Sequence, residues 1–299
     1  MAKDLITLID GTGNQPGDRE STDSDTHVTN VGLLAEALED LPGDQVVRYC
    51  KGIATSGWRL PDFFSFNFGL GWNRKCNEAR RFVRARYEPG DRLFIIGFSR
   101  GAAIARDLAN RLADQGIPTY ALLLFDSVGA FGLPTKLPGI PQEYNLGKRL
   151  DIPSTTRHVH HAIALDEVRE PFTPTLCCSR DGLELEEVWF AGDHANVGGG
   201  RKARALSDVT LRWAIDRLSR HQLRFRPDAE WMQSIGLDPG DVIRRSDYPR
   251  IRLREVRCHR RAPPGTKPKV HRSVEALIEK GYQPLRLKLP LEEHYDVVD

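Results

Sequence analysis

Several features that would place this chain in a specialised class are scarce or missing. Its 299 residues include five cysteines, an odd number without a C-x-x-C pair, so reduced thiols in a cytosolic compartment are the simplest interpretation. No apolar stretch is long enough to cross a bilayer. The start of the chain does not resemble a signal peptide, because Asp10 interrupts a short apolar run. We therefore expect a soluble globular protein that is synthesised in the cytoplasm.

The chain also lacks an excess of charge of one sign, since 43 basic and 41 acidic residues leave a net charge of +2. Such a balance creates no field that would attract nucleic acid, so no nucleic-acid partner is expected. Neither a G-x-x-x-x-G-K-[ST] loop nor a strand-linked G-x-G-x-x-G motif is present, which disfavours nucleotide binding. No cofactor is predicted.

What the chain does contain is a regular alternation of predicted strands and helices. Strands are expected at 5–9, 45–50, 93–96, 120–125, 158–165 and 186–190, and helices at 28–41, 73–87, 101–110 and 207–221. This alternation predicts an α/β fold with a mostly parallel sheet and helices on both faces. We expect a single domain over residues 1–299, with an arginine- and proline-rich C-terminal appendage from about residue 227.

The most informative stretch runs from Leu93 to Ala102 and reads LFIIGFSRGA. Four apolar residues form the predicted strand, Ser99 lies at a sharp turn between Gly97 and Gly101, and small residues then begin a helix. A strand, a strained turn and a helix around G-x-S-x-G are the context of a nucleophile elbow, which exposes the serine hydroxyl beside helix N–H groups. The sequence therefore predicts Ser99 as a nucleophile in an α/β-hydrolase-like fold.

A serine nucleophile needs a histidine that takes its proton and a carboxylate that orients the histidine. His194 is the favoured base, because it follows an apolar strand within a glycine-rich, adaptable loop; His271 is the alternative. Asp126 and Asp166 both end predicted strands at the edge of the sheet where sites form in open α/β folds. We favour Asp126 as the acid and keep Asp166 as the alternative.

The oxyanion that forms during acyl transfer needs backbone N–H donors. One is expected from the turn after the first strand, where Asp10 is followed by Gly11 and Thr12, and either of the last two could donate. The other is expected from Arg100, directly after the serine.

Three histidines, His158, His160 and His161, form an H-x-H-H pattern that could suggest a metal ion. Because no second cluster of ligands accompanies the pattern in the sequence, we predict no metal site.

The residues considered so far belong to segments that occur in the same order in a known family. These segments are 10–14 (DGTGN), 97–102 (GFSRGA), 125–129 (FDSVG), 164–167 (ALDE), 189–194 (WFAGDH), 197–200 (VGGG) and 271–274 (HRSV). With them the chain resembles the α/β-hydrolase domain of type VI secretion phospholipase effectors and their bacterial and fungal relatives. The resemblance implies a Ser-Asp-His esterase acting on phospholipid acyl esters, with Ser99 as nucleophile, Asp126 as acid and His194 as base. It also implies export by a specialised secretion system.

We therefore expect a serine ester hydrolase whose substrate is an acyl ester such as a phospholipid. The alternative is a non-catalytic binding or regulatory module on the same scaffold. Residues 58–72 hold six aromatic side chains and residues 244–261 hold eight arginines, and either segment could touch a membrane peripherally. A core-packing loop and a strand with one solvated face are the plainer interpretations of these two segments.

Overall fold

The computed structural model describes residues 2–11, 28–52, 68–129, 148–167, 169, 172–229, 232, 235, 267–282 and 295–299. At residues 68–70 only the backbone is described. Thr12, the aromatic segment up to residue 67 and the arginine-rich segment 244–261 lie outside these ranges.

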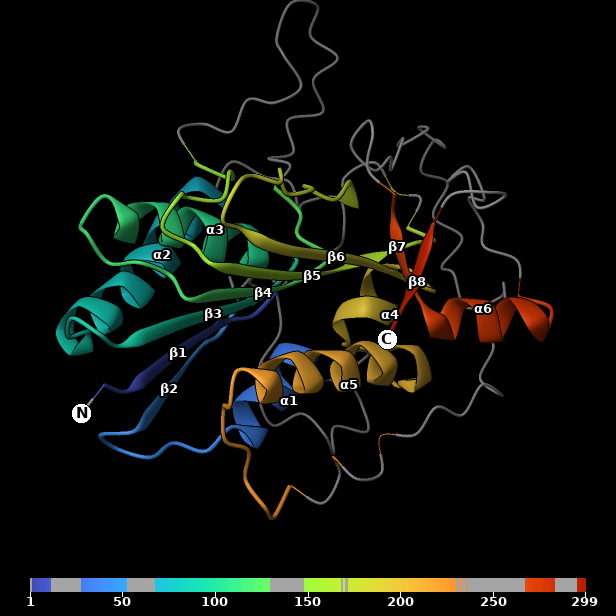
Figure 1. Ribbon diagram of the computed structural model, residues 1–299, viewed down its shortest axis with the longest axis horizontal. Coiled ribbons are helices and arrows are strands. Elements are labelled where there is room, and N and C mark those ends of the chain that lie inside the picture. Colours follow the sequence, from blue (N-terminus) through green and yellow to red (C-terminus); the bar gives the residue numbers. More distant parts are fainter. Residues whose placement is uncertain are drawn as a thin grey trace, which may run out of the picture.

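Within the described ranges, eight strands form one sheet in which every neighbouring pair is parallel (Figure 1). The strands are β1 (Asp4–Ile9), β2 (Gln45–Cys50), β3 (Arg92–Phe98), β4 (Ala121–Phe125), β5 (His158–Ala164), β6 (Glu184–Phe190), β7 (Lys269–His271) and β8 (Asp296–Val298). Their spatial order is β2-β1-β3-β4-β5-β6-β7-β8. Because all run the same way, their carboxyl ends share one edge, where sites form in α/β sheets.

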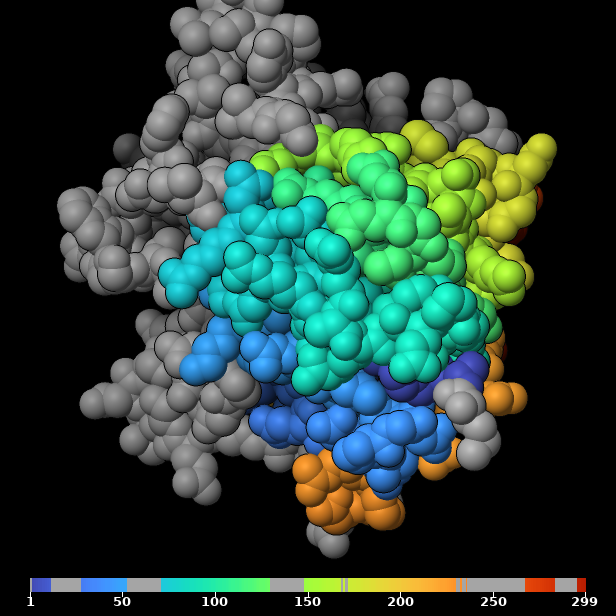
Figure 2. Space-filling model, turned by 90° about the vertical axis from the view of Figure 1, so that its left-hand side faces the viewer, coloured from blue at the N-terminus to red at the C-terminus, as the bar shows by residue number. Residues whose placement is uncertain are grey.

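Helices cover both faces of this sheet. The described part of the chain holds α1 (Asn30–Ala37), α2 (Phe68–Arg86), α3 (Arg100–Ala113), α4 (His194–Gly198), α5 (Ala205–Arg220) and α6 (Arg272–Glu279). Helices α2 and α3 lie on one face, and α1, α4 and α5 lie on the other (Figure 1). Figure 2 shows α2 and α3 side by side on this face of the molecule.

Two apolar layers of the core are supplied alternately by the strands. In β1, Leu5 and Ile9 pack in the layer with α2 and α3, whereas Ile6 and Leu8 pack in the layer with α1 and α5. Successive strand residues point to opposite faces, so a strand that is covered on both sides is mostly apolar along its whole length. The predicted α/β architecture with a mostly parallel sheet is therefore confirmed.

Several boundaries differ from the sequence expectation. Helix α1 ends at Ala37, because Leu38 turns into extended backbone and forms a bridge with Phe225. Helix α2 begins at Phe68, before the predicted start at Asn73. The segment that holds His194, expected as a loop, is the short helix α4.

The C-terminal stretch after residue 227, expected as an appendage, contributes to the sheet where it is described. Strand β7 pairs with β6, and β8 pairs with β7. Val274 and Leu277 of α6 pack with Trp189 of β6 and Val270 of β7 in a third apolar cluster. No helix in the described ranges combines the length and the apolar character needed to cross a membrane.

Candidate functional site

Ser99 lies between β3 and α3 in a strained backbone conformation. Its φ and ψ are 58° and −120°, a region that residues with a side chain rarely adopt. The turn is held by hydrogen bonds to the neighbouring strand connection. The Ser99 N–H donates to the Phe125 carbonyl at 2.9 Å, and the Val128 N–H donates to the Ser99 carbonyl at 3.1 Å. The strand end at β4 therefore supports the turn that carries the serine.

The two glycines beside Ser99 are required by close backbone packing. A Cβ at Gly101 would lie 2.1 Å from the Ile9 carbonyl oxygen, and one at Gly97 would lie 2.6 Å from the Gly101 carbonyl oxygen. Both distances are far below van der Waals contact, and the opposing atoms belong to the backbone. Glycine at these positions lets α3 begin directly against β1.

His194 and Asp126 are hydrogen-bonded to each other. His194 Nδ1 lies 2.7 Å from Asp126 Oδ2, although the two residues are 68 positions apart in the sequence. Asp126 follows β4 and is fully buried, and its other oxygen accepts a hydrogen bond from the Ala164 N–H at 3.1 Å. His194 is the first residue of α4, whose N-cap Asp193 accepts hydrogen bonds from the Ala195 and Asn196 N–H groups. This cap fixes the start of α4 and therefore the position of the His194 Cα and the direction of its side chain.

The imidazole of His194 is packed next to the elbow. Its ring centroid lies 4.7 Å from that of Phe98, the residue before Ser99, and 4.8 Å from that of Phe172. A Cβ at Gly198 would lie 1.9 Å from the Phe98 ring, so α4 approaches this ring closely only because residue 198 is glycine. These contacts bring the serine, the histidine and the aspartate to the same edge of the sheet.

One charged residue outside the predicted site, Glu167, adjoins His194, and it pairs in turn with Arg169. The buried Glu167 accepts a hydrogen bond from the His194 N–H at 3.3 Å and forms an ion pair with Arg169 at 2.6 Å. Burial alone would raise the pKa of Glu167, but Arg169 outweighs it and keeps this pKa below its usual value. The Arg169 guanidinium also lies 4.0 Å from the centroid of the Phe172 ring. Glu167 is the last residue of the ALDE motif, and this motif was the feature of the sequence that could have pointed to it.

Asp166 and His271, the alternative acid and base, have other partners. Asp166 Oδ2 accepts a hydrogen bond from the Gly192 N–H at 2.7 Å and another from the Tyr282 hydroxyl. His271 is the N-cap of α6, where Nδ1 accepts from the Ser273 N–H at 3.2 Å. Burial lowers the pKa of His271 to about 4. The structure thus brings His194 to Asp126. The two alternative residues lie elsewhere, Asp166 in a turn and His271 at a helix cap.

Of the predicted oxyanion donors, Gly11 and Arg100 are described. The Gly11 N–H donates to the carboxylate of Asp10 at 2.7 Å, so it must be released before it can serve an oxyanion. Asp10 is buried and also accepts from the Tyr49 hydroxyl at 2.5 Å; burial raises its pKa to about 6. Arg100 begins α3, where backbone N–H groups at the helix N-terminus face the elbow, and burial lowers the pKa of its guanidinium to about 10.

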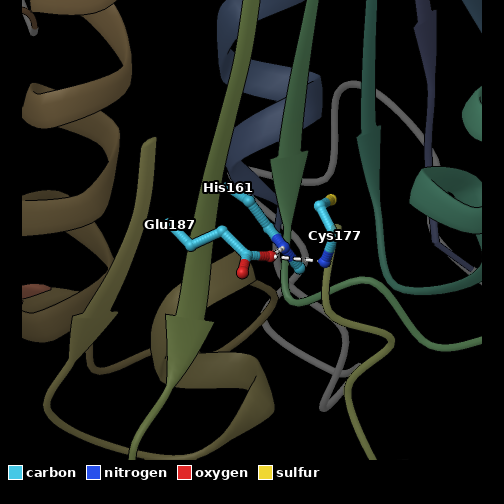
Figure 3. Close-up of side chains that lie close together, drawn as sticks. All are labelled: His161, Cys177 and Glu187. Atoms are coloured by element: carbon cyan, nitrogen blue, oxygen red, sulfur yellow. Dashed lines mark hydrogen bonds and ion pairs between the residues drawn. The ribbon is translucent and has the colours of Figure 1, made fainter. Parts of the chain in front are cut away.

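A second, largely buried polar cluster lies beside the residue that follows Asp126, because the Ser127 N–H donates to His161 Nε2 at 3.1 Å. Figure 3 shows its three members. The cluster consists of His161 on β5, Glu187 opposite it on β6, and Cys177, with their potential ligand atoms within 4.8 Å of one another. His161 Nδ1 lies 2.8 Å from Glu187 Oε1, and the Cys177 N–H donates to the same oxygen at 2.9 Å. Burial raises the pKa of the Cys177 thiol to about 12. The sequence showed the histidine pattern but not that it meets a cysteine and a glutamate.

The chain matches a known family over most of its length. The sequence model of the family described as "T6SS, Phospholipase effector Tle1-like, catalytic domain" matches residues 3–122 and 118–217. Among curated proteins, the uncharacterized protein YEL023C of Saccharomyces cerevisiae is 30% identical over 136 residues, which cover 40% of this chain and 19% of that protein.

Two solved structures align with this chain. An uncharacterized protein from Pseudomonas aeruginosa aligns with a TM-score of 0.51 at 19% identity, over 77% of this chain and 48% of that one. A structure of the Tle1 effector bound to the VgrG spike of the type 6 secretion system aligns with a TM-score of 0.47 at 21% identity, over 67% and 51%. The chain therefore spans about half the length of these two proteins and about a fifth of the yeast relative.

Proposed function

The chain belongs to the Tle1-like phospholipase effector family of type VI secretion, as its motifs predicted, and from this premise we propose that it is a serine ester hydrolase. The single observation that carries the proposal is the 2.7 Å contact between His194 and Asp126 beside the strained Ser99 turn. A buried carboxylate, an imidazole and a serine on an elbow are the three groups that acyl transfer needs. We assign them as acid, base and nucleophile.

In the proposed reaction, Ser99 Oγ attacks the acyl carbonyl carbon while His194 accepts the hydroxyl proton. Because Asp126 accepts a hydrogen bond from Nδ1, the other ring nitrogen, Nε2, is the atom that takes and returns the proton. His194 then donates the proton to the leaving alcohol oxygen, and the acyl group stays on Ser99. A water molecule then gives a proton to the same imidazole while its oxygen attacks the acyl carbon. The bond from that carbon to Ser99 Oγ breaks, and the imidazole returns the proton to Oγ, which releases the carboxylic acid and restores the serine.

Backbone N–H groups stabilise the negative oxygen of the intermediate in this proposal. The start of α3 supplies the Arg100 N–H next to the nucleophile. The second donor comes from the turn at Gly11 and Thr12, after the Gly11 N–H leaves the Asp10 carboxylate. No cofactor or metal takes part in these steps.

The family supports one substrate class. Its members are described as phospholipase effectors, so we propose an acyl ester of a phospholipid, reached by peripheral contact with a membrane surface. Family membership also supports transfer of the chain out of the cell by a specialised secretion system.

Substitution of the nucleophile tests the proposal. We expect S99A to lower hydrolysis of p-nitrophenyl acyl esters and of phospholipid vesicles by a factor on the order of 10³ or more, with an unchanged circular dichroism spectrum. S207A is the matched control, because Ser207 is also buried and its hydroxyl donates to the carbonyl of Arg204, the N-cap of α5.

Two results would contradict the proposal. Equal turnover by S99A and by the wild type would remove Ser99 as nucleophile. A folded wild type that neither hydrolyses esters nor reacts with a fluorophosphonate probe would instead favour a non-catalytic binding module on the hydrolase scaffold. Released fatty acid from one glycerol position only would define the positional class of the phospholipase.

A further inference from the structure

The backbone at Asp126 has an unfavourable conformation. It is held there by contacts with residues outside the proposed catalytic triad. The φ angle of Asp126 is 38°, in the left-handed region that favours glycine. Such a turn persists only when the surrounding structure holds it. The Asp126 N–H donates to the Ala162 carbonyl at 2.7 Å, and the next carbonyl, of Ser127, accepts from the Thr175 N–H at 2.7 Å.

A further contact on this turn comes from the imidazole of His161. The Ser127 N–H donates to His161 Nε2 at 3.1 Å. Since Nε2 accepts, Nδ1 must carry the proton, and it donates to Glu187 Oε1 at 2.8 Å. Glu187 is fixed in turn by the Cys177 N–H at 2.9 Å, as the dashed lines in Figure 3 show. The imidazole of His161 is fully buried, so water does not compete for these bonds.

We propose that His161 is a positioning residue, which holds the Asp126 carboxylate in line with His194 through the backbone N–H of Ser127. Glu187 fixes the tautomer of His161 that can accept this N–H. The chain of contacts crosses the sheet from β6 through β5 to the end of β4. The inference rests on the proposed function for its effect on turnover, whereas its effect on the geometry of Asp126 does not depend on that function.

The contacts favour this role over a metal site formed by the same three residues. Both ring nitrogens of His161 already have partners, and one of these partners is a backbone N–H. The Cys177 N–H also points at Glu187 Oε1, so two positive dipole ends converge where a cation would bind. A raised pKa disfavours the thiolate form of Cys177 that would bind a metal ion.

Two polar variants at position 161 differ in side-chain length. They test whether an acceptor atom must extend as far as His161 Nε2 to bind the Ser127 N–H. The carbonyl oxygen of glutamine can extend to the place of Nε2 and accept from Ser127, whereas that of asparagine ends at the level of Nδ1. We expect H161N to lower kcat about 10- to 100-fold with KM within about twofold of wild type, because a displaced carboxylate affects chemistry and not binding. H161Q should restore kcat to within about fivefold of wild type.

The chain supplies a matched control one residue away. His160 pairs with Glu186 at 2.9 Å in the same strand register but on the opposite face of the sheet, away from Asp126. H160N should therefore leave kcat unchanged, even if it costs similar stability in urea unfolding. Equal losses of kcat in H160N and H161N would mean a general effect on the sheet and would overturn the proposal.

A spectroscopic measurement tests the geometry without any substrate. We expect the proton between His194 Nδ1 and Asp126 to give a far-downfield ¹H NMR signal in the wild type. This signal should move or broaden in H161N and persist in H161Q and H160N. An unchanged signal in H161N would overturn the positioning role, whether or not the protein proves to be an esterase. One equivalent of Zn²⁺ bound on titration of the wild type and lost in C177S would assign His161 to a metal site instead.

Discussion

At the scale of single residues, Ser99 and Asp126 share an unusual backbone. Together with Gln222 they are the non-glycine residues with positive φ among those that the structure describes. Both follow central strands of the sheet, β3 and β4, and the Val128 N–H bonds to the Ser99 carbonyl between them. Strain of this kind concentrates at sites where the fold must present a side chain in one direction.

Asparagine substitutions test which aspartate serves His194. D126N keeps the shape of the side chain but removes the negative charge that accepts the hydrogen bond from His194 Nδ1. We therefore expect kcat to fall by about 10⁴. D166N should lower the rate by less than about tenfold, because Asp166 binds the Gly192 N–H and the Tyr282 hydroxyl rather than the imidazole. Steady-state kinetics on both variants decide between the two acids, and a larger loss in D166N would reverse the assignment.

At the scale of elements, the junction between β3 and α3 decides how the serine is presented. Helix α3 crosses the end of β1 at contact distance, because Gly101 has no side chain to keep it away from the Ile9 carbonyl. The helix interior carries alanines at 102, 103 and 105, all buried against the sheet. Small residues therefore set the approach of the helix, and this approach sets the position of its N-terminal N–H groups.

The close contact at Gly101 leads to a prediction about stability. In G101A the new methyl would lie 2.1 Å from a backbone oxygen, so either β1 or α3 must move. We expect the free energy of unfolding to fall by about 3 kcal/mol and activity to fall with it. A113G, at the end of the same helix, is the control and should cost about 1 kcal/mol. Urea denaturation measures both, and a cost in G101A no larger than in A113G would contradict the packing argument.

At the scale of the whole molecule, two histidines connect stability to pH, the buried His271 and the half-buried His221. Burial lowers the pKa values of His271 and His221 to about 4, below the ordinary value of 6.5. Below pH 6.5 the unfolded chain takes up protons that the folded chain resists. The stability that these neutral histidines provide is therefore complete above pH 6.5 and is lost as the pH falls toward 4.

Replacement of one of these groups tests the linkage. Asparagine is a good N-cap, so H271N can keep the contact with the Ser273 N–H while it removes the titrating ring. We expect the unfolding free energy of H271N to fall less than that of wild type between pH 7 and pH 4, by up to about 3 kcal/mol. Parallel curves for the two proteins in urea unfolding at several pH values would contradict this account. Esterase activity of H271N at pH 7 should remain, since His271 lies in a cap.

The sequence anticipated the local parts of this protein well. The apolar run before Ser99 and the small residues after it predicted a strand, a turn and a helix, and these appear as β3 and α3. It did not anticipate α4, because five residues around His194 carry little periodicity and the capping box of Asp193 depends on one reciprocal contact with Asn196. Nor did it anticipate β7 and β8, since strands of three residues are too short to show a pattern.

What the sequence determined by itself was the set of residues at the carboxyl edge of a parallel sheet, because hydrophobic alternation and glycine placement are local properties of the chain. Only the tertiary structure decided that Asp126 rather than Asp166 meets His194, that Asp10 engages the Gly11 N–H, and that His161 lies beside the residue that follows Asp126. These pairings join residues on different strands or turns, and they depend on strand order, register and side-chain direction. Such quantities are fixed by packing across the whole sheet and leave no mark in any single segment.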